Sequence, residues 1–191
     1  MKHSLPWVDV LFISLTVLWV SEFFLFKGKR ASDGKNEQQE NKSFYLILSC
    51  VVACISVCIL LQQLEWTRMT VASIPFIGVV IYSGGISLRY WSMYLLRKQF
   101  SRHVQTSSSM DLVSSGPYRI MRHPLYTGLF LCVLGVAFYT GTVVGILLTT
   151  VVMLTVLMKR IQLEEQMLTA TLPKHYDKWK QTRWVLFPWV Y

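Results

Sequence analysis

The longest uncharged stretch of the chain, residues 125–158, constrains its fold more than any other feature. It is 34 residues long. As one helix it would measure about 50 Å, whereas the hydrocarbon core of a membrane is about 30 Å thick. The stretch must therefore turn back, and the residues that favour a turn are 139–142. We expect a tight helical hairpin with two short arms, in which Gly141 and Gly145 let the arms approach closely.

Three further apolar runs are long enough to cross a membrane as helices. They occupy residues 7–26, 44–64 and 72–96. Of the whole chain 53% is hydrophobic and 15% is charged, whereas about a quarter of a soluble domain is charged. A chain of 191 residues cannot bury so much apolar surface in its own core, so lipid must cover part of it. The sequence therefore predicts an all-α integral membrane protein with about five transmembrane helices, of which the last two form the hairpin.

The basic residues predict an orientation in the membrane. Sixteen of the 19 Lys and Arg residues lie in three polar segments, residues 27–42, 97–123 and the tail from residue 159, which five spans place on one side. Because cytoplasmic loops carry an excess of Lys and Arg, we expect the N-terminus outside and the loop 97–123 and the C-terminus in the cytoplasm. We expect the net charge of +9 to serve contact with anionic membrane lipids, since no nucleic-acid-binding motif is found.

The polar segments differ in their expected structure. Residues 27–42 are expected to form a solvated loop, and Glu22 is expected near the membrane surface, a turn from Lys27. Residues 159–172 predict a cytosolic helical tail that ends before Pro173. The chain is accordingly divided into residues 1–98, with the first three helices, and residues 99–191, with the hairpin and the tail.

Three of the four cysteines, Cys50, Cys54 and Cys58, recur every fourth residue and so share one face of a helix. A metal or redox site is one interpretation of this pattern. Small apolar residues on a packed or lipid-facing helix face are the favoured interpretation, and no metal site is expected.

Two polar stretches that carry candidate chemistry fall on the same side, residues 105–128 and 159–165. In the first, Pro124 suits the first position of a helix, whose free backbone N–H groups favour an anion. His123 precedes it, and its alternative role is that of an interfacial residue capping the helix. In the second, Arg160 and Glu164 are four residues apart on one helix face, where an ordinary ion pair is the alternative.

Taken in order, these residues resemble a family signature. It comprises Gly116, Pro117, Tyr118, Arg122, His123, Pro124, Tyr126 and Gly128, then the hydrophobic hairpin, and then Arg160, Glu164 and Glu165. This combination resembles the C-terminal half of the isoprenylcysteine carboxyl methyltransferases, which are related to the phospholipid methyltransferases. The resemblance covers the chain from about residue 100 to its end. It implies a small, five-span, prokaryotic-type member.

The resemblance implies that the region 99–191 binds S-adenosylmethionine without a Rossmann fold, and no strand–GxGxxG–helix unit occurs in the sequence. Arg160 and Glu164 are the implied catalytic residues, with Arg160 holding the acceptor and Glu164 the cofactor. Arg89 and Trp91 are expected beside the lipid tail of the acceptor, although an interfacial belt is their alternative role. Glu165 is expected to be solvated. The implied cofactor-binding residues are Gln105, Met110 (where the family often has His), Asp111, Leu112, Val113, Tyr118, His123, Pro124, Tyr126 and Glu164.

The implied reaction is methylation of a lipid-like acceptor, most directly the carboxylate of an isoprenylcysteine. A carboxylate is ionised at neutral pH and needs no general base, and the planar fork of Arg160 suits it. An amine acceptor would instead have to lose a proton, with help from Glu164 or Glu165. Phospholipid amine N-methylation, a nicotinamide-dependent membrane reductase of the sterol type and a non-catalytic membrane scaffold remain the alternatives.

Overall fold

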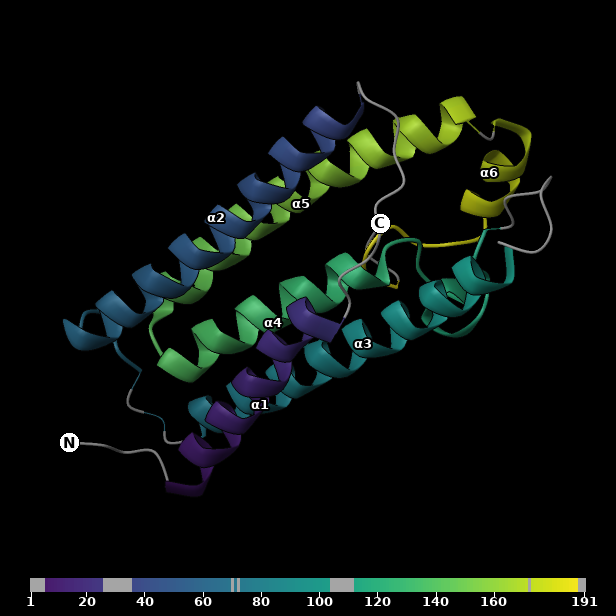
Figure 1. Ribbon diagram of the computed structural model, residues 1–191. Helices are drawn as coiled ribbons and strands as arrows, with labels where there is room; N and C mark the ends of the chain where they lie inside the picture. The colour runs from purple at the N-terminus through teal and green to yellow at the C-terminus, as the bar shows by residue number, and fades with distance from the viewer. Residues whose placement is uncertain are drawn as a thin grey trace.

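The described part of the computed structural model is helical and contains no strand, as the sequence predicts (Figure 1). It covers residues 6–25, 36–69, 71, 73–103, 112–171 and 173–188. Five long helices are followed by a short one, and a single 3-10 turn, η1, precedes α4. In order, these elements are α1 (Pro6–Leu25), α2 (Asn36–Gln63), α3 (Ile74–His103), η1 (Gly116–Arg119), α4 (Pro124–Thr140), α5 (Val143–Thr171) and α6 (Pro173–Lys180).

Helix α4 is the centre of the bundle. It packs most extensively against α3, and it also contacts α2 and α5, while α1 packs against α3. Figure 1 shows α2 and α5 side by side, with α6 beyond the far end of α5. The apolar core lies between these helices and includes Tyr82, Cys132, Val133, Met153 and Leu157, all at most 1% exposed.

The predicted hairpin is confirmed at the predicted turn. Helix α4 ends at Thr140, and α5 begins at Val143. Between them Gly141 takes a left-handed conformation (φ 69°, ψ 33°), which a glycine adopts without steric penalty, and its N–H closes the last turn of α4.

The close approach of helices expected at Gly145 involves different partners. A Cβ atom at Gly145 would lie 3.2 Å from the Sγ of Cys58, so Gly145 faces α2 and not the other arm of the hairpin. The tight contact of α4 is with α3 instead. A Cβ at Gly85 would lie 2.7 Å from the backbone nitrogen of Cys132, and one at Gly135 would lie 2.7 Å from that of Tyr82. Glycine therefore allows these two backbones to touch.

The start of α2 corrects the predicted loop 27–42. Residues 36–42 are the first turns of α2, because their Glu, Gln and Lys residues favour helix and the apolar run behind them propagates it. Residues 26–35 lie outside the described part of the chain. The predicted tail helix is confirmed, since α5 continues to Thr171 and ends before Pro173. The separate eight-residue helix α6 was not expected.

Two described segments are long and apolar enough to cross a membrane, Lys42–Gln63 in α2 and Val143–Ala170 in α5. Helix α4, with 17 residues, is a shorter apolar helix. These helices indicate that the protein associates with a membrane, while the count of five spans and their orientation stay predictions. Cys54 and Cys58 are buried, and the Sγ of Cys58 lies 3.4 Å from the Thr149 hydroxyl on α5, as a packed face requires. Among the described residues no cluster suited to a metal ion occurs.

Candidate active site

A cavity of about 360 Å³ lies at the start of α4 and is lined by several polar residues of the predicted site. Residues from α2, α3, α4, α5 and η1, and from the segment between η1 and α4, contribute to its wall. One part of the wall is apolar and the other carries charged and aromatic groups. The lining residues are Phe44, Ile47, Arg89, Met93, Leu96, Tyr118, Arg122, His123, Leu125, Tyr126, Leu129, Arg160 and Glu164.

The segment that enters α4 is held by residues 184–186, which follow α6. The N–H groups of Arg122 and His123 donate to the carbonyls of Trp184 and Val185 at 2.7 and 3.2 Å. The Thr127 hydroxyl donates to the carbonyl of Leu186 at 2.9 Å. Pro124 is the first residue of α4, as predicted, and His123 precedes it with its side chain 6% exposed. These bonds fix the position of His123 at the cavity wall.

Trp179 of α6 and Arg183, which follows α6, hold the turn η1 and the segment before it. Arg183 donates from Nε to the carbonyl of Tyr118 at 2.8 Å, and its guanidinium lies 4.6 Å from the centre of the Trp179 ring. The indole of Trp179 donates to the Ser114 hydroxyl at 3.0 Å. Burial raises the pKa of the Tyr118 phenol, with the Glu164 carboxylate as a second cause, so Tyr118 is a neutral hydrogen-bonding group at physiological pH.

Tyr126 connects the two residues predicted to be catalytic. Its hydroxyl donates to Oε2 of Glu164 at 2.7 Å and accepts a hydrogen bond from Nε of Arg160 at 3.2 Å. Arg160 and Glu164 are one helical turn apart on α5, and Tyr126 reaches them from α4. The cavity therefore presents a cation and an anion at a fixed separation, joined by a phenol.

Glu165 is ion-paired and only 24% exposed, which corrects the expectation that it is solvated. Its Oε1 accepts a hydrogen bond from Nη1 of Arg122 at 2.6 Å and lies 3.2 Å from Nε2 of His123. Tyr176 of α6 is fully buried, and burial together with the nearby Glu165 charge raises the pKa of its phenol. Sequence reasoning missed this cluster because its members come from three separate elements.

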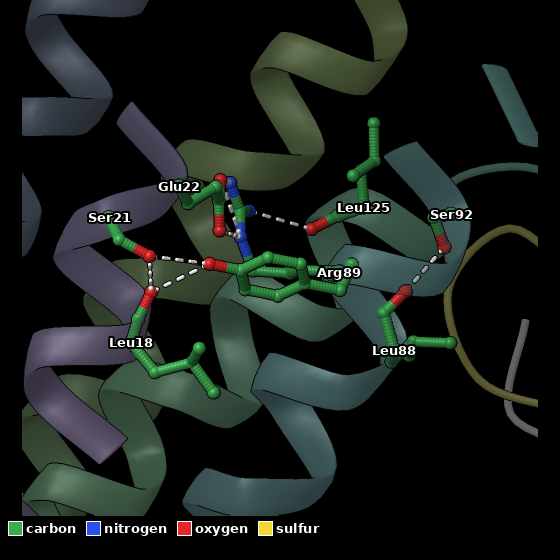
Figure 2. A network of polar contacts seen from close by, with 8 residues as sticks. Leu18, Ser21, Glu22, Leu88, Arg89, Ser92 and Leu125 are labelled. Carbon is green, nitrogen blue, oxygen red and sulfur yellow. Dashed lines mark hydrogen bonds and ion pairs between the residues drawn. The ribbon is translucent and has the colours of Figure 1, made fainter. Parts of the chain in front are cut away.

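Glu22 is buried beside Arg89, which corrects its expected position at the membrane surface. Nε of Arg89 donates to the two carboxylate oxygens at 2.8 and 3.1 Å, and Nη2 bonds the same carboxylate. Nη1 donates to the carbonyl of Leu125 at 3.1 Å, as Figure 2 shows. The sequence could have indicated this ion pair, because Glu22 and Arg89 are opposite charges within apolar runs and a lone charge inside a membrane is costly.

The structure brings many of the predicted residues together. Of the predicted cofactor residues, Tyr118, His123, Tyr126 and Glu164 line the cavity, and so do Arg89 and Arg160. Pro124 is buried behind the wall, and Leu112 and Val113 lie half-buried outside the lining. Trp91 is 55% exposed, also outside the lining, beside Gly116. Gln105, Met110 and Asp111 lie outside the described residues.

The region that contains most of the cavity matches a known protein family. Residues 74–175 match the model of the phospholipid methyltransferase family. The match includes every lining residue of the cavity except the two from α2. A curated relative, the protein-S-isoprenylcysteine O-methyltransferase of Schizosaccharomyces pombe, is 31% identical over 99 residues. This alignment covers 51% of the present chain and 42% of that protein, so the chain spans less than half the length of its relative.

Proposed function

This chain belongs to the phospholipid methyltransferase family, and on that premise we propose that it methylates a lipid-like acceptor with S-adenosylmethionine as methyl donor. The favoured acceptor is the carboxylate of an isoprenylcysteine-type substrate, and the product is its methyl ester. The observation that carries the proposal is the junction at Tyr126, which holds Arg160 and Glu164 in one cavity.

The residues of the cavity fit such a methyl donor. A volume of about 360 Å³ is within the range of small-molecule pockets. The Glu164 carboxylate suits the ammonium group of an amino acid moiety, and the rings of Tyr118 and Tyr126 suit a sulfonium cation. Gln105, Met110, Asp111, Leu112, Val113, His123 and Pro124 are proposed to complete this site.

Arg160 is proposed to orient the acceptor. When bound, S-adenosylmethionine supplies the methyl group from its sulfonium. An acceptor carboxylate is already charged at neutral pH, so the chain has no proton to remove and contributes by alignment. The guanidinium of Arg160 presents paired donors to a carboxylate, and the Tyr126 hydroxyl on its Nε limits the directions that it can take.

The apolar part of the wall is proposed to hold the lipid tail of the acceptor. Phe44 and Ile47 come from α2, which is apolar enough to cross a membrane, and Met93 and Leu96 come from α3. The cavity thus joins a charged end to an apolar side, as an amphipathic acceptor needs. We propose that its charged end faces the cytoplasm in a multi-pass protein whose N-terminus is outside.

Phospholipid amine N-methylation is the second candidate, because the family model is that of the phospholipid methyltransferases. In that reaction an acceptor amine must be uncharged when it attacks, and Glu164 is the carboxylate in the cavity that could accept its proton. Arg160 in the same cavity disfavours a cationic acceptor before that proton is lost, which is why the carboxylate is preferred.

The two candidates are separated by one experiment. Detergent-solubilised protein is incubated with methyl-labelled S-adenosylmethionine and either a prenylcysteine analogue or a phosphatidylethanolamine, and the labelled product is identified. Label in a base-labile methyl ester supports the carboxylate, label in the amine supports the second candidate, and label in neither rejects both.

The same assay tests Arg160. Replacing it by Ala should abolish ester formation while S-adenosylhomocysteine still binds, and retained turnover would remove Arg160 from the acceptor site. The matched control is Arg68→Ala, since Arg68 forms a solvent-exposed pair with Glu65, far from the cavity in the turn after α2.

A further inference from the structure

The ion pair between Glu22 and Arg89 is buried at the wall of the candidate active site. The side chains of Arg89 and Glu22 are 13% and 6% exposed. Arg89 lines the cavity, whereas Glu22 lies behind it on α1. Glu22 also lies outside the residues that match the family model, so it is a feature of this chain rather than of the matched region.

Arg89 connects this pair to the first turn of α4. Its Nη1 bonds the carbonyl of Leu125, the residue that precedes Tyr126. Its side chain crosses α4 at Gly128, where a Cβ atom would lie 2.6 Å from Cγ of Arg89. One guanidinium therefore joins three helices, α1, α3 and α4, as Figure 2 shows for Glu22, Arg89 and Leu125.

The hydrogen bonds of Arg89 indicate that it positions other residues and does not itself bind the acceptor. Each of its three guanidinium nitrogens donates to Glu22 or to Leu125. The charge of Arg89 is balanced by the Glu22 carboxylate, which makes it a weak site for an acidic acceptor. A buried ion pair also adds little stability compared with apolar groups of the same volume, so packing alone gives no reason for charges at this position.

We propose that Glu22 and Arg89 form a positioning pair for the proposed methyl transfer, on which this inference rests. The pair holds the carbonyl of Leu125 and thereby the first turn of α4. That turn carries Tyr126, whose hydroxyl joins Arg160 to Glu164. Glu22 thus acts on the site through Arg89, although it touches neither the cavity nor the two predicted catalytic residues.

The test compares Glu22→Leu, Arg89→Met and the double variant with the wild type. Removing one partner leaves an unpaired buried charge, so either single variant is expected to be less stable. The double variant removes both charges and should melt close to the wild type. Its kcat should fall by about 10-fold to 100-fold, because small misplacements of reacting groups have effects of that size. Because either residue needs the other, the single variants should lose as much kcat as the double one.

Hydrogen–deuterium exchange supplies a readout that does not depend on turnover. Peptides covering residues 120–130 should exchange faster in the double variant, while those from the hairpin turn should not change. The matched control replaces the exposed pair, Glu65→Leu with Arg68→Met, and should leave both kcat and exchange unchanged.

Two results would overturn the inference. A double variant with wild-type kcat and exchange would show that the pair only fills space between the helices and does not position Tyr126. A lower KM for the acceptor in Glu22→Leu would mean that Arg89 grips the acceptor and that Glu22 competes with it. A wild type without methyl transfer would reject the proposed function instead, and the exchange measurement would still test whether the pair anchors α4.

Discussion

The hydroxyl of Tyr126 lies between Arg160 and Glu164, 3.2 Å from Nε of the first and 2.7 Å from Oε2 of the second. The two charged residues sit on α5 and the phenol on α4, so the junction requires the hairpin to be closed. A change at Tyr126 should therefore affect the proposed cofactor site and the proposed acceptor site together.

Replacing Tyr126 by Phe tests this junction. The variant keeps the ring but removes two hydrogen bonds to charged groups, each worth about 1.5–3 kcal/mol. We expect kcat/KM to fall by about 10-fold to 100-fold, with a weaker affinity for S-adenosylhomocysteine. Enzyme kinetics and calorimetric titration measure the two effects. Tyr94→Phe is the control, since Tyr94 is 60% exposed on α3 and lies outside the lining of the cavity. An unchanged kcat/KM in Tyr126→Phe would contradict the role of the phenol.

The neighbouring acidic residues of α5 should separate in their effects. Glu164 lines the cavity, whereas Glu165 lies outside the lining and contacts two lining residues, Arg122 and His123. Glu164→Gln should weaken S-adenosylhomocysteine binding by about 10-fold or more with a small change in melting temperature. Glu165→Gln should lower the melting temperature more, because the positive charge of Arg122, whose side chain is 15% exposed, loses its ion-pair partner. Titration calorimetry and thermal melting of both variants decide, and equal effects on binding would reject this division.

Much of the fold could be predicted because it follows from lengths and local chemistry. The hairpin follows from an apolar run that exceeds a membrane thickness, and Gly141 ends α4 where its missing side chain permits a left-handed residue. Pro124 marks the start of α4 because the first helical position needs no backbone donor, and α5 ends at Thr171, before Pro173, because proline lacks that donor inside a helix. The family signature named six of the residues that line the cavity, since spacing alone left His123 and Arg160 with ordinary alternatives; the six are Tyr118, Arg122, His123, Tyr126, Arg160 and Glu164.

The pairs between distant segments could not be predicted in the same way. Glu22 and Arg89 are 67 residues apart, and local periodicity holds no information on which helices become neighbours. Glu165 was misplaced for the same reason, because its partners precede α4. The contact between α3 and α4 had a weak signal, since both helices carry glycines seven residues apart, one pair ending at Gly85 and the other at Gly135.

The buried phenol of Tyr176 predicts how stability depends on alkaline pH. Burial raises its pKa above the ordinary value of 10.0. Above pH 10 the unfolded chain therefore loses this proton while the folded protein keeps it, so the free energy of unfolding decreases as pH rises. The melting temperature of the wild type should fall more steeply between pH 8 and about 11 than that of Tyr176→Phe, by a few degrees in all. Tyr45→Phe, which alters an exposed tyrosine on α2, should retain the wild-type slope. Parallel slopes for all three proteins would contradict the prediction.

Adjacent glycines on α3 allow the packing of α3 against α4 to be tested in one helix turn. A Cβ atom at Gly85 would meet the backbone of α4, 2.7 Å from the nitrogen of Cys132 and 2.9 Å from the carbonyl oxygen of Gly128. Backbone atoms cannot rotate away, so Gly85→Ala should push the helices apart and destabilise the protein by about 1–3 kcal/mol. Gly84 is exposed, and a Cβ there would have no neighbour within 4 Å.

Gly84→Ala should accordingly be neutral or stabilise α3 by up to about 1 kcal/mol, because alanine favours helix over glycine. The two variants add the same methyl group to neighbouring positions, so thermal melting in detergent compares packing alone. Arg89 lies one turn beyond Gly85 and bonds α4 at Leu125. Separation of the helices should therefore also weaken S-adenosylhomocysteine binding in Gly85→Ala but not in Gly84→Ala. If the variants melt alike, the glycine contact does not determine how α3 and α4 pack.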